Sequence, residues 1–316
     1  MGYVYALCAA LLFGMNGSVT KVIIGAGLDP AQLTLFRVSG TALIAAVVLL
    51  FLNRGAFRVT WRQLGLLSIL GVVGVALLQF NYAVAISILP VGITLLIEYT
   101  AVLMVALVAF FFLHERVRAR LWVAIGFVLA GLAVVAQIWA SELVPFGVLM
   151  AFGAAGSLAL YFLLGEREVG KTSPMAVAFW TMTASAIFWG IFSGWWTIDP
   201  AIFTTPVSMS GTLAQLELPL LIPLLWNVIM GSFLPFFLSL LALKHLTATA
   251  AGVVASAEVI FAFVVAWLWL GEGLDPVQIV GVVVVLAGII LAQTARLDKV
   301  VDADLAITAE STDSLV

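Results

Sequence analysis

The chain has 316 residues, of which 64% are hydrophobic and 9% are charged, and its mean hydropathy is +1.24. A soluble domain carries about 25% charged residues, so this composition excludes an ordinary soluble protein and predicts an all-α, polytopic membrane protein. The formal net charge is only −3, and the single cysteine, Cys8, excludes a disulfide framework. We therefore expect no metal, no cofactor and no nucleic-acid partner, with the lipid bilayer as the main surroundings.

Apolar runs of about 20 residues, the length that spans a bilayer, recur along the chain. The first is expected to be a membrane span rather than a signal peptide, because the N-terminus offers no basic residues before it. We predict ten transmembrane helices, at residues 3–24, 31–52, 64–86, 91–113, 121–140, 145–165, 174–195, 218–243, 247–270 and 276–295. Residues 296–316 are polar and acidic, and we expect them to form a disordered cytoplasmic tail.

Basic residues are confined to alternate loops. Eleven of the 13 Lys and Arg residues fall in segments 53–63, 114–120, 166–173, 244–246 and 296–299. The other loops, 25–30, 87–90, 141–144, 196–217 and 271–275, contain none. The positive-inside rule therefore predicts that both termini are cytoplasmic, and the regular alternation supports the count of ten helices.

The chain contains an internal duplication. Sliding Leu89–Gly131 by 157 residues places it on Leu246–Gly288 without a gap, with 11 of 43 positions identical. Glu115 then falls on Glu272, and Gly131 falls on Gly288. A landmark Glu and a landmark Gly held in one ungapped frame indicate a repeat rather than biased composition.

The repeat extends upstream to the first and sixth helices. FGMNGS at 13–18 resembles FGAAGS at 152–157, and Pro30 corresponds to Pro174 at the next helix start. The repeated unit thus has five helices, over residues 3–140 and 145–295. Because five is odd, the second copy enters the membrane from the opposite side, which gives the inverted repeat typical of secondary transporters.

These features carry a family resemblance. The 5+5 repeat, the FGxxGS segments, the second helix LTLFRVSGTALI and the LAG-bearing fifth and tenth helices resemble the EamA branch of the drug/metabolite transporter (DMT) superfamily. Within it, LPVGITLLIEYTAVLMVAL is similar to the fourth helix of threonine/homoserine and aromatic amino acid exporters. The resemblance implies ten helices around a central cavity, with the fifth and tenth helices packed outside.

Charged residues inside the predicted spans are the first candidates for a site: Lys21, Arg37, Glu98 and Glu258. A charge at mid-helix costs from ~2.5 kcal/mol upward and usually faces a cavity or a partner. Counting 1.5 Å per residue from each helix start places Arg37 and Glu98 at similar depth. Two interpretations stay open for Glu98: an ion pair with Arg37, or substrate binding and proton coupling. We expect Lys21, near a helix end, to extend toward the interface.

Glu258 stands alone in the ninth helix. A lone carboxyl in a medium of low dielectric is favoured in its neutral form. It is therefore either a proton carrier or a neutral group hydrogen-bonded to Ser256, Asn227 or a carbonyl, and we favour the second interpretation. Without proton coupling, the protein is a facilitator driven by the substrate gradient.

Polar and aromatic residues inside the spans form a second candidate group: Asn16, Gln79, Asn81, Tyr82, Tyr99, Trp180, Asn227 and Ser256. An amino acid substrate needs hydrogen-bonding groups for its polar end and an apolar wall for its side chain. We predict that Tyr82, Tyr99 and Trp180 form the wall. Asn16, Asn81 and Glu98 would orient the polar end, with Arg37 holding Glu98.

Glycine and proline mark positions of close packing and bending. We interpret Gly14, Gly17, Gly153 and Gly156 as sites of close helix approach rather than ligand contact. Pro235 lies inside the eighth helix, where it predicts a break or kink. It is a candidate hinge.

The sequence contains no Walker, HExxH, CxxC or GxSxG motif, so we do not expect an enzyme. The family resemblance implies a secondary transporter of the bacterial inner membrane that exports aromatic and other neutral amino acids by alternating access. Other small metabolites or drugs, such as a purine nucleoside or a threonine/homoserine-like compound, remain alternatives. A channel or an intramembrane enzyme is the more remote interpretation.

Overall fold

A computed structural model describes residues 1–52, 54–112, 119–135, 143–169, 173–243, 245 and 254–292. Within these ranges the chain is mostly helical, with one small antiparallel sheet. Glu115, the predicted tail at 296–316 and the predicted ends of several spans lie outside the described residues.

The first half of the chain runs through helices of unequal length. They are α1 (Gly2–Gly25), α2 (Pro30–Leu52), the 3-10 helix η1 (Arg54–Phe57), α3 (Trp61–Ile69), the π-helix η2 (Leu70–Ala76), α4 (Leu77–Ile88), α5 (Val91–Glu98), α6 (Ala101–Phe112) and α7 (Ala119–Val135). Local signals define their starts. Thr60 and Gln63 form a capping box at α3, and Pro30, whose fixed φ suits a first helical turn, begins α2.

The second half contains helices, 3-10 turns and the sheet. They are α8 (Pro145–Val169), α9 (Pro174–Phe192), η3 (Trp195–Thr197), η4 (Pro200–Phe203), β1 (Pro206–Ser208), η5 (Gly211–Leu213), β2 (Glu217–Pro219), α10 (Leu221–Val228), the π-helix η6 (Ile229–Phe233), α11 (Leu234–Leu243), α13 (Ala257–Val265) and the π-helix η7 (Ala266–Leu270). A further apolar helix spans Pro276–Ala292. The Ser173 hydroxyl accepts from the Ala176 N–H and caps α9.

Six helices in the described part of the chain are long and apolar enough to cross a membrane. They are Gly2–Gly25, Pro30–Phe51, Trp61–Ile88, Pro145–Leu164, Met175–Phe192 and Leu221–Ser239, and shorter apolar helices lie at Val91–Val105, Trp122–Val135, Ala257–Leu270 and Pro276–Ala292. This agrees with the predicted all-α membrane protein. The number of crossings stays a prediction.

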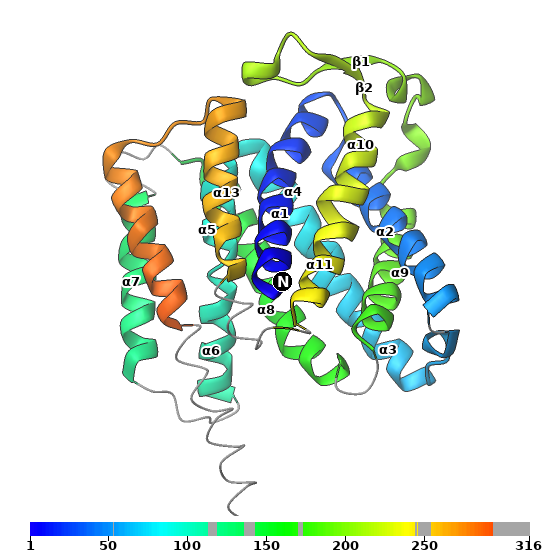
Figure 1. Cartoon of the computed structure of the whole chain (residues 1–316), viewed down its shortest axis with the longest axis horizontal. Helices are drawn as coiled ribbons and strands as arrows, with labels where there is room; N and C mark the ends of the chain where they lie inside the picture. Colours follow the sequence, from blue (N-terminus) through cyan, green and yellow to red (C-terminus); the bar gives the residue numbers. More distant parts are fainter. Residues whose placement is uncertain are drawn as a thin grey trace, which may run out of the picture.

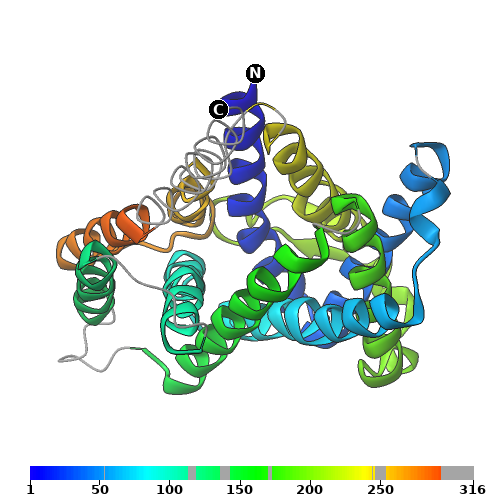
Figure 2. The same cartoon turned by 90° about the horizontal axis from the view of Figure 1, so that it is seen from below.

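The two halves of the chain interlock rather than standing side by side. α1 packs against α11 and α13, while α8 packs against α4 and α6. α2 packs along α9. In both views α1 lies among helices of the second half (Figures 1 and 2). The core is therefore built between elements far apart in the sequence.

The 157-residue offset of the sequence repeat recurs in the local geometry. The π-helix η2 covers Leu70–Ala76, and the same offset leads to residues 227–233, where η6 covers Ile229–Phe233. A π-turn places an extra residue in the helix and commonly occurs at functional positions. Equivalent positions of the two halves thus depart from α-helical geometry in the same way.

Glycines allow α7 and the helix Pro276–Ala292 to pack at close range, side by side at one edge of the molecule (Figures 1 and 2). A Cβ atom at Gly131 would lie 2.6 Å from Val285 Cγ2, and one at Gly288 would lie 2.7 Å from Val128 Cγ2. These are the repeat-equivalent Val and Gly positions, each Val covering the other helix's Gly. The contact is therefore reciprocal, as two related copies would make it.

The long segment between α9 and α10 folds over one end of the helices (Figure 1). β1 and β2 pair within it, and Trp269 Nε1 of η7 donates to Met209 O at 2.9 Å. Thr212 Oγ1 lies 3.0 Å from Leu268 O. The segment is thus a cap attached to the end of η7.

We expect Gly131→Ala to lower the free energy of unfolding by about 1–3 kcal/mol, because overpacking strains a close helix contact. The added methyl group would meet Gly281 O at 2.8 Å and Val285 N at 2.9 Å, which are backbone atoms that cannot rotate away. Thermal unfolding of the purified protein in detergent measures the change. Gly126→Ala is the matched control in α7, since a Cβ there has nothing within 4 Å, and equal losses would contradict the prediction.

Candidate functional site

Two helices are interrupted at repeat-equivalent positions. α5 ends at Glu98 and α6 begins at Ala101, with Tyr99 and Thr100 in a turn between them. The Thr100 hydroxyl closes this turn by donating to Ile97 O at 2.7 Å. Adding 157 to 99 leads to Ser256, which is the turn residue directly before α13. Interrupted helices near the midplane surround the substrate sites of many transporters, so this pair locates the candidate site.

The two interruptions are joined by a hydrogen bond. The Tyr99 hydroxyl donates to Glu258 Oε2 at 2.7 Å and lies 3.3 Å from Ala255 O. An O–H bond to a carboxylate of this length is strong. Glu258 is therefore hydrogen-bonded, as we favoured, and the partner that the structure shows is Tyr99, which the sequence analysis did not name.

Arg37 of α2 is held by α1 and by the π-helix η6. Its Nε donates to Ser232 Oγ at 2.5 Å, and its Nη2 lies 3.4 Å from Gly231 O. With the Asn16 amide oriented to satisfy both of its polar atoms, its oxygen accepts from Nη2 at 2.9 Å. Pro235 explains why Gly231 O is available, because a proline has no N–H to donate to the carbonyl four residues earlier.

The predicted ion pair between Arg37 and Glu98 is not formed within the described part of the chain. The N–H groups of the guanidinium donate instead to oxygens of Ser232, Gly231 and Asn16. Equal depth along two helices therefore did not translate into direct contact, because depth alone says nothing about the direction in which each side chain points. Arg37 still interacts electrostatically with both Glu98 and Glu258.

Buried amides support the Arg37 contacts. Asn227 is fully buried, and its Nδ2 lies 2.8 Å from the Asn16 amide and 2.9 Å from Thr20 Oγ1. Ser232 donates to Asn227 O at 3.1 Å. Gly231 has no side chain where the Asn16 amide lies, so a larger residue would displace it. Asn16 and Asn227 thus belong to one polar network with Arg37.

Two buried oxygens of the site, Glu98 Oε2 and Asn227 Oδ1, have no hydrogen-bond partner among the described residues. The Glu98 carboxylate interacts electrostatically with Glu258 and Arg37, so two carboxylates and one guanidinium share the same interior region. A buried carboxylate oxygen without a partner is expensive to maintain, which makes Glu98 a candidate for binding a ligand.

Tyr82 lies beside these charges. It is 7% exposed, belongs to the same apolar cluster as Leu95 and Tyr99, and interacts electrostatically with Glu98 and Arg37. Gly17 makes its position possible, because a Cβ there would collide with the Tyr82 hydroxyl and with Val91. The structure thus brings Tyr82 and Tyr99, two members of the predicted wall, to the same region.

Other predicted residues lie elsewhere. Trp180 donates to Ala56 O at 3.2 Å and packs against Phe179 in a separate cluster. The prediction that Trp180 forms an aromatic wall with Tyr82 and Tyr99 is therefore wrong. Asn81 faces α8, where a Cβ at Gly153 would lie 2.9 Å from its Nδ2. Gln79 Oε1 is buried without a partner among the described residues, although no contact connects it to Glu98. Ser256 stands at the second helix interruption.

The glycine prediction holds at three positions and fails at the fourth. Gly14 approaches the backbone of α13 at Glu258 and Ala262, Gly17 approaches Tyr82, and Gly153 approaches Asn81. Among the described residues, nothing lies within 4 Å of a Cβ at Gly156, so close packing within this part of the chain does not explain it. The sequence reasoning also missed Thr20 and Ser232, small polar residues that carry no signal in an apolar helix.

Lys21 has a partner that the sequence analysis did not name, and its extension toward the interface stays a prediction. Its Nζ forms an ion pair with Glu272 Oε1 at 2.5 Å. Glu272 entered the sequence analysis only as a landmark of the repeat, and that landmark was the available signal for its role.

Comparison with known proteins identifies the family. The sequence profile of the EamA-like transporter family matches residues 1–137 and again residues 145–294. The chain belongs to the EamA-like transporter family. Together with the apolar helices, this membership makes it a multi-pass membrane protein of the DMT type, as the sequence resemblance implied.

The individual relatives of this EamA-like protein have low sequence identity to it. The threonine/homoserine exporter RhtA of Escherichia coli K12 is 29% identical over 218 residues, covering 68% of this chain and 67% of RhtA. RhtA of Salmonella typhimurium LT2 is 28% identical over the same length. A solved structure described as "Crystal structure of protein" matches with a TM-score of 0.63 and 16% identity, covering 93% of this chain and 97% of that one. This last likeness concerns the fold alone.

We expect Arg37→Lys to lower the free energy of unfolding by about 1–3 kcal/mol, because buried acceptors lose their donors. A lysine keeps the charge but cannot reproduce the three-way fork of the guanidinium. Unfolding of the purified protein in detergent measures the change. The matched control is Arg62→Lys on the exposed start of α3, which should stay within about 0.5 kcal/mol of the parent. Equal losses in both variants would contradict the assigned contacts.

Proposed function

We propose that this EamA-family protein is a secondary transporter that exports amino acids across the inner membrane by alternating access. The observation that carries the proposal is the meeting of two interrupted helices at Tyr99 and Glu258, in the same interior region as the partnerless Oε2 of Glu98 and the guanidinium of Arg37. A site of this kind offers charged and polar groups inside an apolar bundle, where they are costly unless they bind something.

The charges of the site match an amino acid zwitterion. Glu98 has a free oxygen for the substrate ammonium group, and Glu258 offers a second carboxylate nearby. Arg37 carries the opposite charge and would bind the substrate carboxylate. Tyr82 and Tyr99 provide the aromatic surface next to the substrate side chain.

Two substrate classes follow from different observations. The RhtA relatives are named as threonine/homoserine exporters, which favours small neutral amino acids with a hydroxyl group. Tyr82 and Tyr99 favour aromatic amino acids, the class expected from the sequence, although the wall lacks Trp180. We take the small hydroxylated amino acids as the first candidate and the aromatic ones as the second. Nucleosides and other metabolites or drugs come after both.

The membrane arrangement completes the proposal. Six long apolar helices and four shorter ones lie in the described part of the chain, and we propose that they form ten crossings in two inverted halves. The alternation of basic loops places both termini in the cytoplasm. The end of the bundle that carries β1 and β2 then faces outward (Figure 1), and a rocking motion of the two halves would expose the site to each side in turn.

We expect purified protein in liposomes to take up labelled threonine and homoserine with saturable kinetics and counterflow, with labelled phenylalanine as the test of the aromatic class. Glu98→Gln should lower kcat/KM about 10- to 150-fold, because a bond to a charged group contributes about 1.5–3 kcal/mol. Glu217→Gln is the control, since Glu217 is an exposed carboxylate on β2 outside the site.

Three results would contradict the proposal. Correctly inserted protein that takes up none of these amino acids refutes the substrate class. Unsaturable flux without counterflow indicates a channel. Full activity in Glu98→Gln would remove Glu98 from the binding site.

Proton coupling is tested by the same assay. If Glu258 carries the coupling proton, an imposed pH gradient should accelerate uptake in the parent but have no effect on Glu258→Gln. Uptake that ignores the gradient in both proteins would instead establish a facilitator, and would leave Glu258 with its structural bond to Tyr99.

A further inference from the structure

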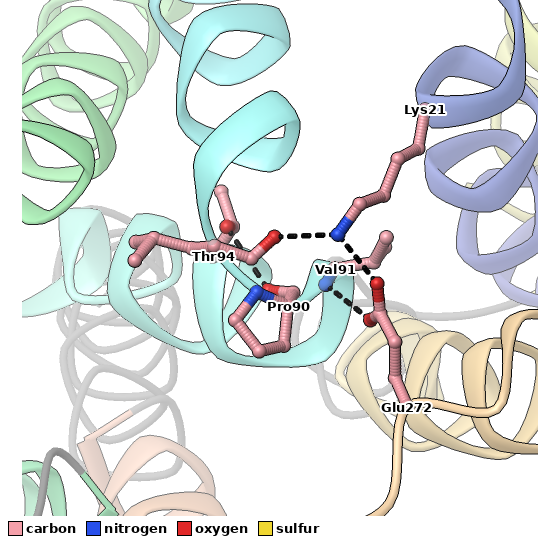
Figure 3. Close-up of polar contacts among 6 residues, drawn as sticks. Lys21, Pro90, Val91, Thr94 and Glu272 are labelled. Carbon is pink, nitrogen blue, oxygen red and sulfur yellow. Dashed lines mark hydrogen bonds and ion pairs between the residues drawn. The ribbon is translucent and has the colours of Figure 1, made fainter. Parts of the chain in front are cut away.

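A second polar cluster lies away from the candidate site and joins three segments of the chain. Lys21 Nζ of α1 forms its 2.5 Å ion pair with Glu272 Oε1 and donates to Leu89 O at 3.0 Å (Figure 3). The second carboxylate oxygen of Glu272 accepts from the Val91 N–H at 2.8 Å. Glu272 follows η7, while Leu89 and Val91 lie at the start of α5.

The cluster lies between the candidate site and one end of the bundle. Lys21 is five residues beyond Asn16 on α1, and Val91 is seven residues before Glu98 on α5. At 1.5 Å per residue, the cluster is about 7 to 11 Å from the site along the helices. Glu272 follows the end of η7, where Leu268 and Trp269 contact the segment that contains β1 and β2. The proposed orientation places this end outside.

The contacts of this cluster connect elements of the two halves of the chain. The side chains of Lys21 and Glu272 are 29% and 16% exposed, so water reaches the pair only partly. Beneath it, Val91 packs directly over Gly17 of α1, since a Cβ at Gly17 would collide with it. Leu89 and Ile23, both almost fully buried, add apolar surface. The segment thus combines an ion pair with a tight apolar contact.

We propose that Lys21, Glu272 and the Leu89–Val91 backbone form the outer gate of the carrier, which is closed in this structure. The inference rests on the proposed transport function, because only a carrier must separate α1 from α5 and η7 in each cycle. Ion pairs and hydrogen bonds to backbone atoms suit this role: they hold the closed state yet can be exchanged for water when the gate opens. Apolar packing alone offers no such exchange.

A cysteine below the gate reports on it without any substrate. Ser18 is fully buried, and its hydroxyl has no hydrogen-bond partner within the described residues. It lies three residues before Lys21, hence one turn deeper on the same face of α1. In a Cys8→Ser background, Ser18→Cys is then the single thiol of the chain. An impermeant maleimide added to sealed, right-side-out vesicles measures access to it from outside.

We expect Glu272→Gln to accelerate labelling of Ser18→Cys about tenfold, because the lost charged hydrogen bond stabilises only the closed gate. Gln keeps an oxygen for the Val91 N–H, so the change isolates the ion pair. Lys21→Met removes the same pair while keeping an apolar stem, and should give the same acceleration. Glu217→Gln, on the same end of the molecule but outside the cluster, should leave the labelling rate unchanged.

Fast labelling in the parent, or no acceleration in either gate variant, would overturn the proposed gate. If the cluster only stabilised the fold, Glu272→Gln would lower the unfolding temperature without changing the labelling rate. That result would also overturn the proposed gate. Because labelling needs no substrate, the gate is tested even if the liposomes reject every amino acid. Conversely, amino acid uptake with an unchanged labelling rate would refute the gate and leave the transport function standing.

Discussion

The bond between Tyr99 and Glu258 connects the two places where the helical backbone is interrupted. Each interruption alone would expose unpaired backbone groups inside a membrane, which is costly where no water can reach them. Because the two interruptions lie together, one side chain contacts polar groups beside both of them. The Tyr99 hydroxyl lies within reach of Ala255 O and of the Glu258 carboxylate. The remaining charges then gather around this junction, because Arg37 and Glu98 interact electrostatically with Glu258.

Small residues make that arrangement possible. Gly14 brings α1 against the backbone of α13, and Gly17 leaves room for the Tyr82 hydroxyl and Val91. Gly231 leaves room for the Asn16 amide, which in turn contacts Arg37. Membrane helices pack without a hydrophobic driving force between them, so close van der Waals contact and interhelical hydrogen bonds must hold them. The polar network and the glycines are therefore two parts of one packing solution.

The candidate site and the proposed gate share α1 and the helix that begins at Val91. Asn16 and Lys21 lie on α1, while Glu98 and the Leu89–Val91 segment lie at opposite ends of α5. Any movement of α5 relative to α1 would therefore alter both regions together. The proposed alternating access would use this connection between the two regions.

Much of this protein followed from the sequence alone. Composition determined the membrane class, and the 157-residue repeat predicted equivalent positions that the structure shows as paired π-helices and paired helix interruptions. The family expectation was confirmed by the profile match. Three of the four charged residues inside apolar spans, Arg37, Glu98 and Glu258, lie in one interior region, and the fourth, Lys21, belongs to a separate cluster. The sequence does not show in which direction each side chain points. Arg37 turned to Ser232 and Asn16 instead of Glu98, Trp180 packed away from the other aromatic residues, and Lys21 found Glu272 across 251 positions. These contacts depend on which helix faces pack against each other, and only the tertiary structure decides that. An almost uniformly apolar helix has a sequence that does not distinguish the face that meets one neighbour from the face that meets another.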